Sequence, residues 1–357
     1  MKKLVLSETH EELDGKMVDF SGYYMPIQYK GVTAEHLAVR ESVGIFDVSH
    51  MGEIFVKGAG AEDFLQYVTS NDISQLSPGK IQYSCMPNGK GGIVDDLLVY
   101  KLAETSYLLV VNASNLDKDW VWLNKNNKWD CKLTNSSDEY SLLAVQGPQS
   151  ITLLQELTDV DLSAIKYYNF KIGSIAGIDE VILSRTGYTG EIGFELYVKN
   201  ESAKQLWEAI FTTSVELKPI GLAARDTLRL EKGFCLYGND INDTTSPIEA
   251  GLGWITKFTK DFVDAKLLKE QKEGGVTKKL VGLELIDKGI ARKDYPIIDA
   301  DGNEIGIVTS GTMSPTLNIA IAMGYVPKVL SKIDTEVFIQ VRNKQLKARV
   351  VTLPFVK

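Results

Sequence analysis

The chain has 357 residues, with 39 basic and 47 acidic side chains and a formal net charge of −8 at pH 7. This acidity argues against a nucleic-acid-binding protein, which needs an excess of basic groups on its surface. The apolar run at the N-terminus ends at Ser7, too early for a signal peptide, and no later run approaches the roughly 20 residues that span a bilayer. We therefore expect a protein without membrane spans and, at this length, two domains rather than one.

The cysteines and histidines indicate a reduced protein without a metal centre. Cys85, Cys131 and Cys235 are odd in number and widely spaced, which predicts free thiols in a cytoplasmic protein rather than a disulfide framework or a zinc site. The three histidines are too few and too scattered to predict metal ligands. Phosphate-loop, dinucleotide-binding and nucleophile-elbow motifs are also missing from the sequence, so the corresponding enzyme classes lose their best support.

The first half of the chain mixes short helices with short strands. Helical spacing predicts helices over residues 33–42, with Thr33 as N-cap, over 60–68 and 151–157, and around Trp120 to Trp129. Apolar alternation predicts strands, listed here in chain order: 52–57, 81–86, 94–102, 107–112 and 141–145. This mixture predicts an α+β domain.

A glycine-rich hairpin and two helices follow. Residues 181–185 and 194–198 read as strands on either side of a connection that contains three glycines. Helices are predicted over 203–212 and 222–232, the second with Gly233 as its C′ residue.

The composition changes near residue 269. The charged, glycine-bearing stretch 269–279 reads as a linker. Beyond it only strands are predicted, over 280–285, 295–298, 304–309, 319–326, 336–341 and 346–351, with a tight turn at Asp301-Gly302. We therefore predict an α+β domain over residues 1–268, a linker over 269–279 and an all-β module over 280–357.

Two adjacent carboxylates lie inside the apolar run from Gly91 to Tyr100. Neighbouring residues of a strand point to opposite faces, so Asp96 shares a face with Tyr100 while Asp95 points to the other. Both faces are otherwise apolar, and we expect at least one of the two carboxylates to be buried, where it needs a cation, a hydrogen bond or a ligand. The alternative is a strand end at which both acids accept backbone N–H bonds.

Further acidic, basic and aromatic residues allow two interpretations. Glu195 lies between Phe194 and Leu196 in a strand, and by itself reads as a solvent-facing glutamate. Arg225 and Arg229 share one face of a helix, where Asp226 can pair with Arg229, and a solvated face is the default interpretation. Taken together with several tyrosines, these groups suit a flat, amino-bearing ligand, because carboxylates accept from amino edges and aromatic faces stack on heterocycles.

Several motifs together resemble one known family, the glycine cleavage T-protein family of aminomethyltransferases. They occur in the family's order over nearly the whole chain, at residues 47–53, 91–100, 184–191, 221–230, 236–240 and 310–317. The resemblance implies a folate-binding portion of two interlocked α+β units, followed by a β-barrel module of jelly-roll type, with tetrahydrofolate in a central cavity.

The resemblance also implies a reaction. The methylene carbon of an aminomethyl group, carried on the lipoyl arm of H-protein, passes to tetrahydrofolate; ammonia leaves, and 5,10-methylenetetrahydrofolate and dihydrolipoyl H-protein are formed. Asp96 matches the family's functional aspartate, Glu195 would accept hydrogen bonds from the pterin, and Arg225 would hold the folate. The expected lining of the folate cavity comprises Tyr83, Tyr100, Asn112, Tyr168 and Tyr188.

Three other functions are alternatives to this one. A folate-dependent iron–sulfur assembly factor carries a K-G-C-[YF]-x-G-Q type motif, whereas residues 232–239 here read K-G-F-C-L-Y-G-N, with the cysteine displaced and no glutamine. A folate-using demethylating oxidase is normally fused to a flavin domain, for which this chain has neither the length nor the fingerprint. A non-catalytic folate-binding regulator stays open.

Overall fold

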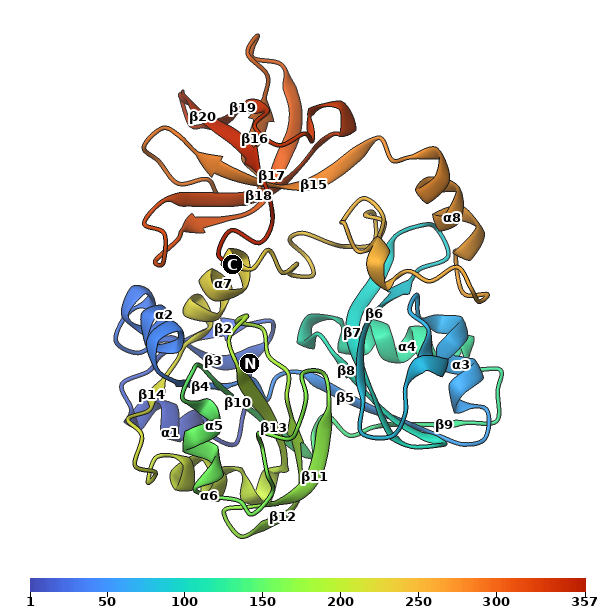
Figure 1. Cartoon of the computed structure of the whole chain (residues 1–357), viewed down its shortest axis with the longest axis vertical. Coiled ribbons are helices and arrows are strands. Elements are labelled where there is room, and N and C mark those ends of the chain that lie inside the picture. The colour runs from blue at the N-terminus through green and yellow to red at the C-terminus, as the bar shows by residue number, and fades with distance from the viewer. The chain divides into compact units, whose positions relative to one another are not determined.

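Figure 1 shows the computed structural model, which describes residues 1–357. Contacts divide these residues into two compact units. Unit 1 comprises Met1–Gln66, Ile73–Tyr83 and Leu97–Asp226, and unit 2 comprises Tyr67–Asp72, Ser84–Asp96 and Thr227–Lys357. The chain therefore passes between the units several times. The boundaries predicted at residues 268 and 279 stay a prediction.

The chain forms eight α-helices. Six of them, α2 to α7, correspond to predicted helices, and α8 overlaps the predicted linker. Their bounds are α1 Ser7–Glu12, α2 Val32–Glu41, α3 Ala61–Val68, α4 Leu116–Asn126, α5 Ser150–Gln155, α6 Asn200–Ile210, α7 Leu222–Glu231 and α8 Ala265–Gly274. Short 3₁₀ turns cover Ile73–Gln75, Ala113–Asn115, Gly253–Ile255 and Lys328–Leu330. None of the helices combines the length and the apolarity that crossing a membrane requires.

The ends of three helices can be compared with the predictions. The N-cap of α2 is Gly31, with φ of 116°, and not Thr33, which lies inside the helix. Gly233 does follow α7 in the left-handed region, with φ of 68°, as predicted for a C′ residue. The first half of the predicted linker is helical, because α8 continues to Gly274 and packs through the fully buried Leu268.

A six-stranded sheet and a small three-stranded sheet belong to unit 1. The larger has the order β11 (Phe170–Ile175), β12 (Ile178–Ser184), β13 (Gly193–Lys199), β10 (Tyr140–Gln146), β4 (Gly44–Asp47) and β14 (Lys218–Pro219). The smaller has the order β1 (Lys2–Lys3), β3 (Tyr23–Gln28) and β2 (Lys16–Phe20) and was not predicted.

The predicted hairpin is confirmed, and its two faces differ in chemistry. Strands β12 and β13 pair antiparallel, with Ser184 opposite Glu195. Phe194 and Leu196 belong to the apolar cluster that also holds Leu206 of α6. The alternate residues of β13, beginning with Glu195, therefore point to the opposite face of the sheet.

A five-stranded sheet has the order β6 (Ile81–Pro87), β7 (Ile93–Ala103), β8 (Ser106–Val111), β5 (Gly52–Lys57) and β9 (Lys132–Asn135). The predicted strands 52–57, 81–86, 94–102 and 107–112 match β5, β6, β7 and β8 within one residue at each end, whereas β9 was not predicted. The acidic pair lies near the start of β7, which alternates as predicted, so Asp96 has the same parity as Tyr100.

The C-terminal module is a closed barrel, drawn in orange and red in Figure 1. Its strands follow the order β15 (Lys278–Leu285), β18 (Ala320–Pro327), β17 (Glu304–Met313), β16 (Pro296–Ile298), β19 (Glu336–Val341) and β20 (Lys344–Val351). All six strands were predicted, and Gly302 takes a φ of 86° at the turn between β16 and β17. Closure removes the exposed edges that an open sheet of this length would have.

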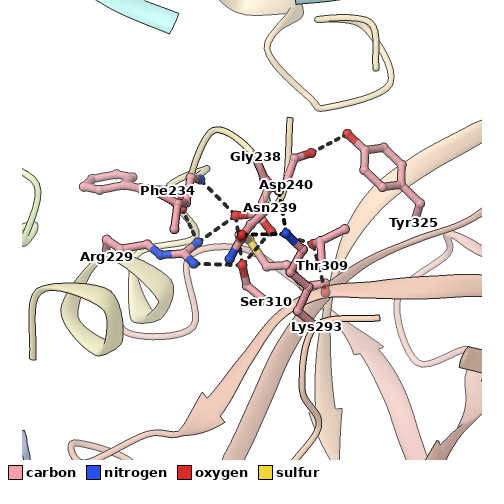
Figure 2. Close-up of polar contacts among 11 residues, drawn as sticks. Arg229, Phe234, Gly238, Asn239, Asp240, Lys293, Thr309, Ser310 and Tyr325 are labelled. Carbon is pink, nitrogen blue, oxygen red and sulfur yellow. Dashed lines mark hydrogen bonds and ion pairs between the residues drawn. The ribbon is translucent and has the colours of Figure 1, made fainter. Parts of the chain in front are cut away.

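Within unit 2, the end of α7 is joined to the barrel by a buried ion pair (Figure 2). Arg229 Nη1 lies 2.7 Å from Asp240 Oδ2, and the two side chains are 1% and 0% exposed. The carboxylate of Asp240 also accepts hydrogen bonds from the hydroxyl groups of Thr309 at 2.5 Å and Ser310 at 2.8 Å, both on β17. The prediction of a solvated helix face is therefore wrong for Arg229.

Candidate active site

A chain of hydroxyl groups lies on the face of β13 opposite the helices. Tyr100 of β7 has its hydroxyl oxygen 2.9 Å from that of Tyr197 and 2.9 Å from Ser184 Oγ. Ser184 Oγ is 2.7 Å from Thr186 Oγ1, which donates to Glu195 Oε2 at 2.5 Å. Five side chains from three segments of unit 1 thus form one continuous polar cluster, and all five are buried.

Glu195 is a buried carboxylate at the end of this series of hydrogen-bonded hydroxyl groups. Its side chain is 6% exposed, so the prediction of a solvent-facing glutamate is wrong. The predicted parity is right, since Glu195 does point away from Phe194 and Leu196, but both faces of β13 are covered. Burial raises the pKa of Glu195, while the positive charge of Arg225 and the hydrogen bond from Thr186 oppose that rise.

Arg225 brings a cation to the same cluster from α7. Its Cζ atom lies 4.8 Å from the centroid of the Tyr188 ring, which is the geometry of a cation–π contact. Its Nη1 atom is buried and has no hydrogen-bond partner. Burial lowers the pKa of Arg225, and the charge of Glu195 opposes that shift. The predicted solvated face is therefore wrong for Arg225 as well, and its guanidinium group keeps a donor available for a ligand.

His50 is a residue of this region that sequence reasoning missed. Its ring packs edge-on against Phe20 with 5.5 Å between the ring centroids, and its buried Nδ1 atom has no partner. Burial, with the nearby charge of Arg225, lowers the pKa of His50 to about 4. The imidazole is therefore neutral near pH 7. The only signal in the sequence was its position in the motif at residues 47–53, from which no role was assigned to it.

The neutral state of His50 predicts an acid-sensitive fold. Its pKa is about 4 in the folded chain against an ordinary value of 6.5, so between these two values the unfolded chain binds the extra proton. Stability should therefore fall as the pH drops through this range, by about 2 kcal/mol at pH 5 from this residue. We expect His50→Gln to flatten the slope of melting temperature against pH between 6.5 and 4.5. An unchanged slope in the variant would contradict the assignment.

The other predicted lining residues of unit 1 are half-buried and come from separate segments. Tyr83 lies in β6, and Asn112 follows β8. Tyr168 has a φ of 60°, and its backbone N–H donates to the carbonyl oxygen of Arg185. The structure thus brings Tyr100, Tyr188, Glu195 and Arg225 into one cluster of unit 1, whereas the other three residues lie on separate segments of the same unit.

Asp96 belongs to unit 2, where its neighbours include two thiols. Asp95 is completely buried and Asp96 is half-buried, which confirms the prediction that at least one of the two carboxylates is withdrawn from water. Burial raises the pKa of the Cys85 and Cys235 thiols well above the ordinary value, and the negative charge of Asp96 raises both further. Both thiols are free and protonated near neutral pH.

Comparison with known proteins gives the family. Residues 6–260 match the GCVT N-terminal domain, and residues 278–357 match the glycine cleavage T-protein C-terminal barrel domain. Aminomethyltransferases from Flavobacterium psychrophilum and Bacteroides fragilis are 58% and 57% identical to the chain, each with full coverage of both sequences. The chain belongs to the glycine cleavage T-protein family of aminomethyltransferases.

A solved structure agrees with this family assignment. The glycine cleavage system aminomethyltransferase T from Bartonella henselae superposes with a TM-score of 0.94 at 37% identity, covering 99% of this chain and 98% of that one. The resemblance drawn from the motifs and the expected fold class are both confirmed. As a member of this T-protein family the chain is an enzyme of the transferase class, an aminomethyltransferase.

Proposed function

We propose that the chain transfers the methylene carbon from the aminomethyl-lipoyl arm of H-protein to tetrahydrofolate, releasing ammonia. The products are 5,10-methylenetetrahydrofolate and dihydrolipoyl H-protein. Family membership supports the reaction class. The observation that carries the folate assignment is the arrangement of Glu195 and Arg225 in unit 1: the buried carboxylate of Glu195 accepts from Thr186 through Oε2, and the buried Nη1 of Arg225 has no partner.

The residues of this cluster fit a reduced pteridine. Thr186 occupies Oε2 of Glu195, which leaves Oε1 to accept an amino or ring N–H group. Nη1 of Arg225 has no partner and can donate to a carbonyl oxygen. A pteridine presents both kinds of group on one flat edge. The cavity that holds this ligand would be lined by Tyr83, Tyr100, Asn112, Tyr168 and Tyr188.

Asp96 would act on the transferred carbon. Tetrahydrofolate supplies the nucleophilic nitrogen that receives this carbon. A fixed carboxylate in surroundings of low dielectric constant stabilises the positive charge that develops as the amine departs. We propose that Asp96 acts mainly through this electrostatic effect and by positioning, without forming a covalent enzyme intermediate. Its half-buried state beside two uncharged thiols supports such a role.

Ammonia release is the decisive assay. Wild-type chain should release ammonia only when tetrahydrofolate and aminomethyl-loaded H-protein are both present. A chain that binds tetrahydrofolate but releases no ammonia from loaded H-protein would instead be a folate-binding regulator. We also propose that it acts in the cytoplasm, which is consistent with its three free cysteines.

Removal of the guanidinium group tests the folate assignment. We expect Arg225→Met to weaken tetrahydrofolate binding about 10- to 150-fold, which is the range for losing a hydrogen bond to a charged group. Arg225→Lys keeps the charge but loses the planar stack on Tyr188, and should fall between wild type and Arg225→Met. Equilibrium binding followed by calorimetry measures both. Equal affinity of wild type and Arg225→Met would contradict the placement of folate beside Arg225.

A further inference from the structure

Glu53 of β5 is a buried acid that the proposed mechanism does not yet use. Its side chain is 1% exposed, and both carboxyl oxygens are buried without a hydrogen-bond partner. Its backbone is fully engaged by contrast, since its N–H donates to Ser137 Oγ at 2.9 Å. Glu35, another buried glutamate, shows the usual arrangement: its carboxylate accepts three backbone N–H bonds, from residues 29, 31 and 221. Buried polar groups without partners are rare and call for a specific explanation.

Strand register places Glu53 on the same side of its sheet as the hydroxyl chain. Glu53 pairs with Val110 of β8, and Val110 pairs with Leu98 of β7. Tyr100 lies two residues further along β7 than Leu98 and so points to the same face. Glu53 and Leu98 are two strand spacings apart, roughly 10 Å between backbones. A glutamate and a tyrosine side chain can both extend into the space above these strands.

The carboxyl group of Glu53 interacts electrostatically with Tyr197. Negative charge on Glu53 and on Glu195 contributes to the raised pKa of Tyr197, after burial and Tyr100. The hydroxyl of Tyr197 lies 2.9 Å from that of Tyr100, so Glu53 and Glu195 flank the same pair of tyrosines. Two carboxyl groups from two different sheets therefore act on one pair of buried tyrosines in unit 1.

The environments of these two acids differ. Glu195 has Arg225 and the Thr186 hydroxyl to favour its charged form. Glu53 has only the distant charge of Lys2, which is itself paired with Asp138, and burial raises the pKa of Glu53 well above the ordinary value. Burial without a partner for either carboxyl oxygen therefore favours the protonated, uncharged form of Glu53, which can donate one hydrogen bond. Acids whose environments differ in this way can take different roles at one binding site.

We propose that Glu53 is a further ligand-binding residue of the folate site in unit 1, donating a hydrogen bond from its carboxyl group to an acceptor atom of the bound folate. This inference rests on the proposed function. It assigns complementary roles: Glu195 accepts hydrogen bonds from the ligand, while Glu53 and Arg225 donate them. A reduced pteridine offers both classes of atom. The unliganded chain leaves Glu53 unsatisfied, and binding supplies the missing partner.

Two variants separate a binding role from a purely structural one. Glu53→Leu replaces the unsatisfied acid by an apolar group of similar size, so the melting temperature of the unliganded chain should rise or stay unchanged. Its affinity for tetrahydrofolate should fall about tenfold, the effect of losing one hydrogen bond. Glu53→Gln keeps a neutral donor and should bind within about threefold of wild type. Calorimetric titration with tetrahydrofolate under a thiol reductant measures both affinities.

The matched control is Glu35→Leu, which removes a buried glutamate that has partners. It should lower the melting temperature, because three backbone N–H groups lose their acceptor. If wild type binds folate and Glu53→Leu binds it equally well, this inference is wrong while the proposed function stands. An equal loss in the Gln and Leu variants would overturn the assignment of an uncharged donor. Absence of folate binding by wild type would overturn the proposed function, and this inference with it.

Discussion

Replacing Asp96 by asparagine should lower the turnover of aminomethyl transfer about a hundred- to a thousandfold while tetrahydrofolate affinity changes little. Losing one preorganised electrostatic group commonly raises a barrier by about 2.7–4 kcal/mol. Asn is nearly isosteric with Asp but carries no charge, so the variant removes stabilisation of the developing cation and keeps the shape. Steady-state ammonia release and calorimetric folate binding measure the two quantities separately.

Asp95→Asn is the control for this experiment, because the two acids are adjacent and differ in burial. Asp95 is completely buried on the other face of β7, whereas Asp96 is half-buried. We expect Asp95→Asn to reduce thermal stability more than Asp96→Asn, with the smaller effect on turnover. Near-normal turnover in Asp96→Asn, at unchanged folate affinity, would rule out Asp96 as the central group.

Breaking the buried ion pair in unit 2 should have the largest effect on stability. We expect Asp240→Asn to lower the free energy of unfolding by about 3–5 kcal/mol, because Arg229 would remain as an uncompensated buried charge. The loss extends beyond one contact. The same carboxylate accepts from the backbone N–H of Leu236 at 2.9 Å and from the hydroxyl groups of Thr309 and Ser310, which Figure 2 shows converging on it. Urea unfolding followed by circular dichroism measures the change.

Two comparisons show whether the ion pair is responsible. The double variant Arg229→Met/Asp240→Leu removes both charges and should recover much of the stability lost in Asp240→Asn, since an apolar pair of similar size is often tolerated. Glu284→Gln breaks a partly exposed pair with Arg349 on the barrel and should cost less than about 1 kcal/mol. A double variant as unstable as the single one would indicate that the hydrogen bonds to β17 dominate instead.

The regular elements were largely predictable because their periodicities are local. Strand alternation located β7, and it correctly placed Glu195 on the opposite face from Phe194 and Leu196. The all-β C-terminal module was equally visible, as a series of short strands behind a charged stretch, and the family resemblance implied that it is a barrel. The missed elements are all short, at most six residues each: the helix α1 and the strands β1, β2, β3, β4, β9, β11 and β14.

Burial of the charged residues was not predictable in the same way. Alternation tells which residues share a face, but it does not tell whether another element covers that face. Glu195 and Arg229 were both interpreted as solvated, and both are buried. The partner of Arg229 is Asp240, and the hydroxyl groups that complete the pair come from β17, about 80 residues further along the chain. No helix spacing could have indicated that contact.

The sequence by itself determined the family, the order of the elements and the identity of the main candidates Asp96, Glu195 and Arg225, because motifs and periodicities are properties of neighbouring residues. Only the tertiary structure decided which of the charged groups lose contact with water and which of them are left without a partner. His50 and Glu53 drew attention only through their buried, unpartnered atoms. Desolvation depends on every segment that packs around a group, and in a fold built from distant segments that information does not lie near the residue in the chain.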